Sequence, residues 1–130
     1  MSARSKVKLA ERLRAFALAL PEAWEDHPWG GDVIKVGKKI FVSFGHPDFK
    51  SALFLCMKLP ESATLVLAED WAKPAGYGLG KSDWVELRFE EPPTVAQHDF
   101  EAWIVESYCA VAPKKVARLA REQHGGGSQA

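Results

Sequence analysis

A glycine-rich segment that ends in a lysine is the sharpest chemical motif in this sequence. Residues 75–82 read Ala-Gly-Tyr-Gly-Leu-Gly-Lys-Ser, which is the spacing of a relaxed phosphate-binding loop. Such a loop binds phosphate when a buried strand precedes it and a helix follows it, because the amides and the helix dipole must point at the anion. Here the polar stretch 69–74 precedes it and a strand-like stretch follows. We therefore interpret it as a structural glycine loop with Lys81 on its surface, and predict no cofactor.

Cationic side chains in two other segments could contact phosphate groups. Lys38 and Lys39 occupy a predicted hairpin tip, and Lys114, Lys115 and Arg118 lie near the end of the chain. Side chains of this kind position proteins on a nucleic-acid backbone. The alternative is an ordinary solubilising surface, because 17 basic residues balance 17 acidic ones and the whole molecule therefore does not attract polyanions.

Trp84 is an aromatic candidate for the same surface. It begins a segment in which Val85, Leu87 and Phe89 alternate with polar residues, so the tryptophan is predicted on the outward side of a strand. An outward indole can stack on a base or anchor a partner peptide. It could equally pack beneath a helix.

Charge is distributed unevenly along the chain. Residues 1–60 carry ten Lys or Arg against six Asp or Glu, residues 61–111 carry three against ten, and residues 112–130 carry four against one. Arg4, Lys8 and Arg12 share the solvent side of a predicted first helix. If the two ends of the chain meet in the fold, their cations form one basic face.

No group of residues has the spacing of a metal centre or a catalytic centre. The histidines are His27, His46, His98 and His124. They are scattered over turns, a helix start and a tail, so we predict no metal site. The acidic doublets could bring carboxylates together only through tertiary contacts. We predict that the protein is not an enzyme; histidines or carboxylates clustered in one pocket would favour an enzyme of unknown type.

Two cysteines indicate the compartment. Cys56 and Cys109 lie in apolar surroundings without a Cys-X-X-Cys neighbour, which favours buried, reduced thiols. No apolar stretch is long enough to cross a membrane, and charged residues interrupt the basic N-terminus before a signal sequence could form. We therefore predict a cytoplasmic protein without membrane association.

The elements of the first half follow from hydrophobic periodicity. Apolar residues recur at spacings of three and four over residues 9–20, which predicts an amphipathic helix that ends near Pro21. Strands are predicted at 33–36 and 40–44, joined by a tight Gly-Lys-Lys hairpin, and a third at 52–58 that is apolar on both sides.

The second half is predicted to add two strands and further helices. A short helix is expected at 62–68, a short strand within the glycine-rich 75–80 and a half-buried strand at 84–89. Thr94 and Gln97 form a capping-box pattern before a long helix, and Pro113 opens a further helix or kinks this one. We predict one α+β domain over residues 1–121 and a disordered tail over 122–130. Its helices pack on one face of a five-stranded, mostly antiparallel sheet.

Four blocks of the sequence together resemble the MmcQ/YjbR family. They read Leu-Pro-Glu-Ala-Trp-Glu (20–25), Val-Gly-Lys-Lys-Ile-Phe (36–41), Tyr-Gly-Leu-Gly-Lys-Ser-Asp-Trp-Val (77–85) and Val-Ala-Pro-Lys-Lys (111–115). The resemblance implies a two-layer fold similar to the CyaY-like and secretion-chaperone-like folds, in the order helix, three strands, helix, two strands, helix.

The same resemblance implies a function, because members of the family are commonly labelled DNA-binding proteins on the basis of fold comparison. It carries over to the glycine loop with Lys81 and Trp84, to the Lys38-Lys39 hairpin and to residues 112–115. Many relatives have a small or basic residue just before the tryptophan. Asp83 occupies that position here, and its negative charge weakens the attraction of Lys81 for phosphate.

Two functional hypotheses follow. The first is a nucleic-acid-binding protein in which the cations contact phosphates and Trp84 stacks on a base. The second is a peptide- or protein-binding module that uses the outer face of the sheet around Trp84. The sequence does not fix the oligomeric state.

Overall fold

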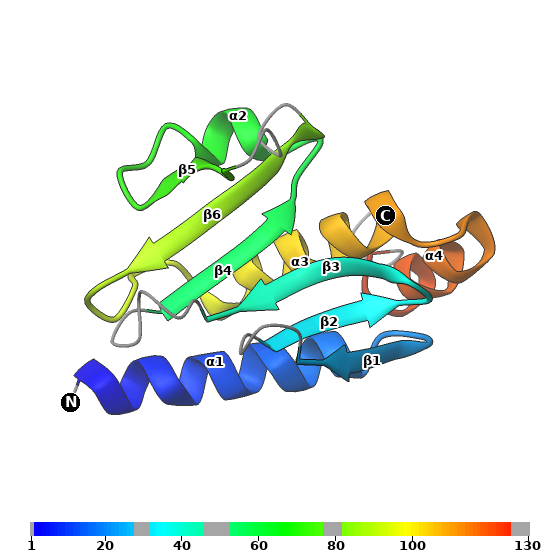
Figure 1. Ribbon diagram of the computed structural model, residues 1–130, viewed down its shortest axis with the longest axis horizontal. Helices are drawn as coiled ribbons and strands as arrows, with labels where there is room; N and C mark the ends of the chain where they lie inside the picture. The colour runs from blue at the N-terminus through cyan, green and yellow to red at the C-terminus, as the bar shows by residue number, and fades with distance from the viewer. Residues whose placement is uncertain (1, 28–31, 46–52, 77–81, 126–130) are drawn as a thin grey trace.

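A computed structural model describes residues 2–27, 32–45, 53–76 and 82–125. Its centre is a six-stranded sheet in the order β1-β2-β3-β4-β6-β5, in which every neighbouring pair of strands is antiparallel (Figure 1). The strands are β1 (Ala23–Asp26), β2 (Asp32–Val36), β3 (Lys39–Phe44), β4 (Leu53–Lys58), β5 (Ala72–Pro74) and β6 (Trp84–Phe89).

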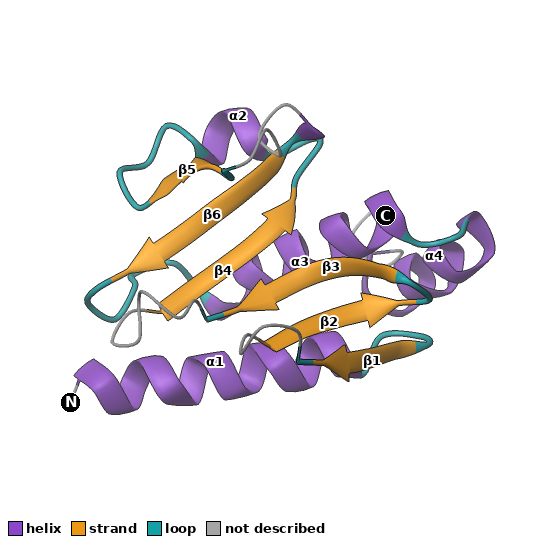
Figure 2. Ribbon diagram, viewed as in Figure 1, coloured by secondary structure: helices purple, strands orange, loops and turns teal. Residues whose placement is uncertain are grey.

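Two long helices, α1 (Ser2–Leu18) and α3 (Gln97–Val111), pack against each other and cover one face of this sheet (Figure 2). A single turn of helix, α2 (Ala63–Val66), lies between β4 and β5 in the chain. The chain continues after α3 into α4 (Lys114–Ala120) and a π-helical turn, η3 (Arg121–Gly125). The predicted α+β architecture, with its helices on one face, is confirmed.

The core lies between the sheet and these two helices because apolar side chains alternate on each strand. Val85, Leu87 and Phe89 of β6 are buried as predicted, and β4 is buried on both sides at most positions. Leu13 of α1 and Ile104 of α3 are fully buried above them. Each such aliphatic side chain stabilises the fold by about 1.5–3 kcal/mol.

A β-bulge at Phe41 connects the sheet to α3. The β2–β3 register shifts between Ile34 and Lys35, which leaves Phe41 as the extra residue and allows both Phe41 and Val42 to be fully buried. The ring of Phe41 packs edge-on against Tyr108 of α3, with centroids 5.1 Å apart. The bulge therefore fixes where the end of α3 lies over the sheet.

The sheet has six strands, whereas the sequence predicted five. Strand β1 was missed because Ala-Trp-Glu-Asp shows no apolar alternation; as an edge strand it is held mainly by its pairing with β2. The short strand predicted within 75–80 lies instead at Ala72–Pro74, just before the glycine-rich stretch, of which residues 77–81 lie outside the described part.

The helix boundaries also correct two details. Ala96, not Thr94, is the N-cap of α3 and makes no side-chain cap, so the predicted capping box is wrong; the Gln97 amide instead donates to Glu101 one turn later. Pro113 precedes α4 as its N-cap, consistent with a new helix opening there. Within the described ranges, no helix is both long and apolar enough to span a bilayer.

Candidate functional site

Tyr108 determines which parts of the chain meet at the end of the molecule that carries the predicted cations. Its hydroxyl, near the end of α3, donates a 2.6 Å hydrogen bond to the carbonyl of Pro21. Pro21 comes shortly before β1, and Ala23 of β1 pairs with Val36, which directly precedes the β2–β3 turn. The end of α3, the start of α4 and the β2–β3 turn therefore lie at the same end of the fold (Figure 1).

We call this end the basic end, and define it by the five cations Lys38, Lys39, Lys114, Lys115 and Arg118. All five are exposed. The three in α4 lie outward because Val116, Ala117 and Ala120 occupy the buried side of that helix. Among the described residues, the ion pairs involve none of the five, so their charges are available to a ligand.

Trp84 lies on the face of the sheet away from α3, two strand spacings from β3, which begins at the basic end. Because neighbouring strands are antiparallel, β3 and β6 begin at the same end of the sheet, and β4 finishes at that end. Trp84 pairs with Lys58, and β4 separates it from β3, at about 5 Å per strand spacing. The indole is half-buried. Lys81, predicted to act with it, lies outside the described residues.

Two acidic residues lower the positive field at this end. Asp83 immediately precedes Trp84, has a φ of 68° and accepts a 2.8 Å hydrogen bond from the Leu59 amide through its carbonyl. Its position is therefore set by the turn, and its charge lies beside the indole. Glu22, which also has a positive φ, is exposed in the turn that Tyr108 anchors.

The cations of α1 do not join the basic end. Lys8 and Arg12 are exposed in the first half of the helix, whose start lies at the opposite end of the molecule from α4 (Figure 1). Since α1 rises about 1.5 Å per residue, Lys8 lies about 15 Å from the end of α1. The described side chains Lys8 and Arg12 therefore do not form a single basic face with the cations of α4.

An apolar groove lies between α2 and α3, in the acidic third of the chain. It has a volume of about 450 Å³ and contains Leu65, Trp71 and Trp103, with Glu69 and Asp99 among its polar residues. Leu65 is 78% exposed, and the two indole centroids are 6.1 Å apart. Sequence reasoning missed this groove because it is formed by tertiary packing. The available signal was an apolar residue on the outer side of a one-turn helix.

Neither cysteine has the properties of a catalytic nucleophile. Both are free thiols. Burial, together with the neighbouring Glu86 carboxylate, raises the pKa of Cys56 to about 12, and burial also raises the pKa of Cys109. A thiol with a raised pKa carries little thiolate at neutral pH and is a poor nucleophile.

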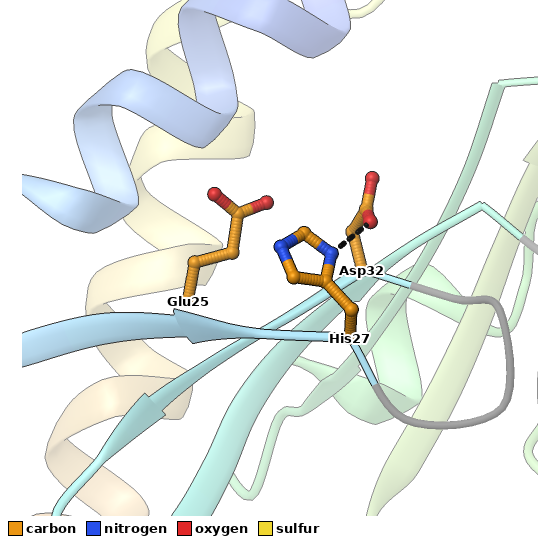
Figure 3. A group of neighbouring side chains, drawn as sticks. All are labelled: Glu25, His27 and Asp32. Atoms are coloured by element: carbon orange, nitrogen blue, oxygen red, sulfur yellow. Dashed lines mark hydrogen bonds and ion pairs between the residues drawn. The ribbon is translucent and has the colours of Figure 1, made fainter.

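Three potential metal ligands meet beside α1, at the other end of the β1–β2 hairpin from Lys38. They are Glu25, His27 and Asp32, and Figure 3 shows the imidazole of His27 between the two carboxylates. His27 Nδ1 is 2.7 Å from Asp32 Oδ1. Arg14 of α1 lies near both carboxylates, with Nε 3.3 Å from Glu25 Oε2 and Nη1 3.4 Å from Asp32 Oδ2. This cluster connects α1 to the hairpin.

The sequence did not reveal this cluster because residues 25, 27 and 32 match no known ligand spacing. The signal that was available is local: positions 25 and 27 share one side of an extended strand, and continuation of the antiparallel register places position 32 opposite position 27. The neighbouring Asp26 faces the other side and pairs with Lys35 at 2.8 Å. The hydrogen bond from Lys35, followed by that from the His27 amide, lowers the pKa of Asp26.

These features define an α+β protein with an open antiparallel sheet, one helical layer and a cation-rich end. The chain belongs to the YjbR family, whose model matches residues 18–110. It is similar to the crystal structure of Deinococcus radiodurans protein DR2400, described as a DUF419 domain, with a TM-score of 0.63 and 24% identity over 89% of this chain and 87% of the other. At this identity the likeness shows the fold alone. A comparison with curated proteins gives no match.

Proposed function

We propose that the protein binds duplex DNA through the basic end. The observation that carries the proposal is that five exposed cations, from two segments far apart in the sequence, lie at one end of the fold and form no ion pair within the described part of the chain. Phosphate contacts need exposed Lys or Arg side chains on one continuous surface, and a hairpin turn beside a short helix can provide such a surface. The function is binding, and no catalytic step is assigned.

We propose that Trp84 and Lys58 extend this surface onto the face of the sheet away from α3. Both residues lie at the end of the sheet where β3 begins. An indole in this position can stack on an unpaired base or pack against a sugar, whereas the cations provide affinity without sequence preference. The acidic groups Asp83 and Glu22 limit the local field, so we expect moderate affinity.

The salt dependence of binding provides a quantitative test. If five phosphates are contacted, log K falls with log salt concentration with a slope of about −4.5, which is about 500-fold between 50 and 200 mM salt. The measurement is fluorescence anisotropy of a labelled duplex at several salt concentrations. In the double variant Lys114→Glu with Arg118→Glu, two contacts are lost, so the magnitude of the slope should fall by about 2.

Helix α1 offers a matched control. Lys8 and Arg12 have the same i, i+4 spacing on an exposed helical surface, and the variant Lys8→Glu with Arg12→Glu changes the net charge equally. Our proposal predicts that this control retains most of the slope of the parent. If the slope fell equally in both double variants, net charge alone would explain DNA binding and the basic end would have no special role. No binding at 50 mM salt would exclude the proposal.

A second candidate function is peptide binding in the groove between α2 and α3. The specific observation is the 78% exposed Leu65 next to two tryptophans, with acidic side chains in the same groove. This chemistry suits a peptide with one large apolar anchor flanked by Lys or Arg. Leu65→Ser should weaken the binding of a labelled Lys-Lys-Phe-Lys-Lys peptide, whereas Val7→Ser, at an exposed apolar residue of α1, should not.

We place both candidate functions in the cytoplasm. The support is that both cysteines are free and have raised pKa values, as expected for a protein that does not depend on disulfides. Fractionation of cells that produce the protein would test the compartment.

A further inference from the structure

We propose that Glu25, His27 and Asp32 form a binding site for a divalent transition metal ion of the zinc class. The three ligand atoms all lie within 4.8 Å of one another. Residues 25 and 27 project from the same side of the β1 strand and its extension, and Asp32 is opposite His27 by continuation of the β1–β2 register. The proposal is independent of DNA binding, because the cluster lies at the other end of this hairpin from Lys38.

The donor set and its dimensions fit such an ion. One imidazole and two carboxylates bind Zn²⁺ and related ions at about 2.0–2.2 Å, with water completing the shell, so neighbouring ligand atoms on a tetrahedral ion are about 3.4 Å apart. The His27 Nδ1 to Asp32 Oδ1 distance of 2.7 Å must open slightly. The other separations, which all lie within 4.8 Å, must close by up to about 1.4 Å. Rotation about the side-chain bonds of Glu25 can supply this movement.

Arg14 supplies the positive charge of the cluster in the metal-free protein. Its guanidinium lies between the carboxylates of Glu25 and Asp32, at 3.3 and 3.4 Å. Glu25 Oε2 is enclosed, yet it accepts no hydrogen bond from the described residues, because the Arg14 contact is an ion pair without hydrogen-bond alignment. The Arg14 side chain is 44% exposed and can move into solvent. A metal ion would satisfy this oxygen and displace the guanidinium.

Competition between Arg14 and the metal ion gives the test. A cluster with only a structural role would not bind Zn²⁺ more tightly when Arg14 is removed. The experiment is isothermal titration of the full chain with Zn²⁺ alone, after chelator treatment, with circular dichroism of each variant to confirm folding. His27→Ala and Asp32→Asn should each weaken Zn²⁺ binding about tenfold or more. Arg14→Ala should tighten it about tenfold, because a cation a few ångströms from the ion is removed.

A matched control is available at the start of α3. His98 Nε2 lies 3.3 Å from Asp99 Oδ1 in an exposed histidine–carboxylate pair with no third ligand among the described residues. His98→Ala should leave Zn²⁺ binding unchanged. The proposal is overturned if the parent shows no binding, if His27→Ala binds as the parent does, or if Arg14→Ala weakens binding instead of tightening it.

Discussion

Replacing Tyr108 by Phe removes one hydroxyl group and tests the contact that positions the basic end. The ring stays in its edge-on contact with Phe41, so no large cavity forms. The loss is the 2.6 Å hydrogen bond to the Pro21 carbonyl. Pro21 is half-buried, so water can partly replace the donor. The free energy of unfolding should fall by about 1–2 kcal/mol, in the lower part of the range for a buried group left unsatisfied.

The difference in the free energy of unfolding between the parent and Tyr108→Phe should also depend on pH, which gives an independent test. Burial, followed by the Glu22 carboxylate, raises the pKa of Tyr108 to about 12 in the folded protein, against about 10 in an unfolded chain. The contribution of Tyr108 to stability is therefore complete below about pH 10 and is lost as the pH rises toward 12. The Phe variant has no phenol to ionise, so the stability difference between parent and variant should shrink over that interval.

Urea unfolding followed by tryptophan fluorescence, at about pH 8 and about pH 11, measures both effects. Trp24→Phe is the control, because it removes a 2.8 Å hydrogen bond to the Gly37 carbonyl from a side chain that is 43% exposed, where water replaces the donor. It should change stability by less than about 0.5 kcal/mol. A Tyr108→Phe effect as small as that of the control, or one unchanged between the two pH values, would refute the reasoning.

Three further outcomes are expected. Ser107→Ala should lower the free energy of unfolding by about 2–3 kcal/mol in urea, because this buried hydroxyl donates to a carbonyl of β3 and accepts from an amide of β4; a loss below about 0.5 kcal/mol would contradict this. Cys56 should react with iodoacetamide far more slowly in the native protein than in urea, given its raised pKa, and equal rates would count against burial. Glu106→Gln should speed amide exchange at the start of α2, because the Glu106 carboxylate accepts from the amide and hydroxyl of Ser62; unchanged exchange would dismiss that anchor.

Much of the fold could be predicted because hydrophobic periodicity and turn chemistry are local. The strict alternation of β6 and the stripe of α1 were sufficient to place both elements. Strand β1 could not be found in this way, because an edge strand needs no apolar alternation when a neighbouring strand holds it. The start of α3 was predicted from a capping pattern, yet the actual N-cap is Ala96, so packing of the helix overrides the local preference.

The candidate site illustrates the difference between residue type and residue position. The sequence identified Lys38 and Lys114 as candidates, but only the Tyr108–Pro21 contact and the strand order show that they share one end of the molecule. Lys8 lies in the first half of α1, a helix that starts at the opposite end of the molecule from α4. The Glu25 and His27 cluster also depends on strand pairing, which a search for motif spacing does not register.

The most direct test of the DNA-binding account is residue-by-residue mapping of the interface. Titration of ¹⁵N-labelled protein with a short duplex, followed by NMR at low salt, reports the amides that change on binding. The account predicts shifts concentrated in the β2–β3 turn around Lys38 and in the first turn of α4 around Lys114, with the indole of Trp84 also affected. Shifts concentrated instead around Lys8 in α1, or in the groove around Leu65, would contradict it.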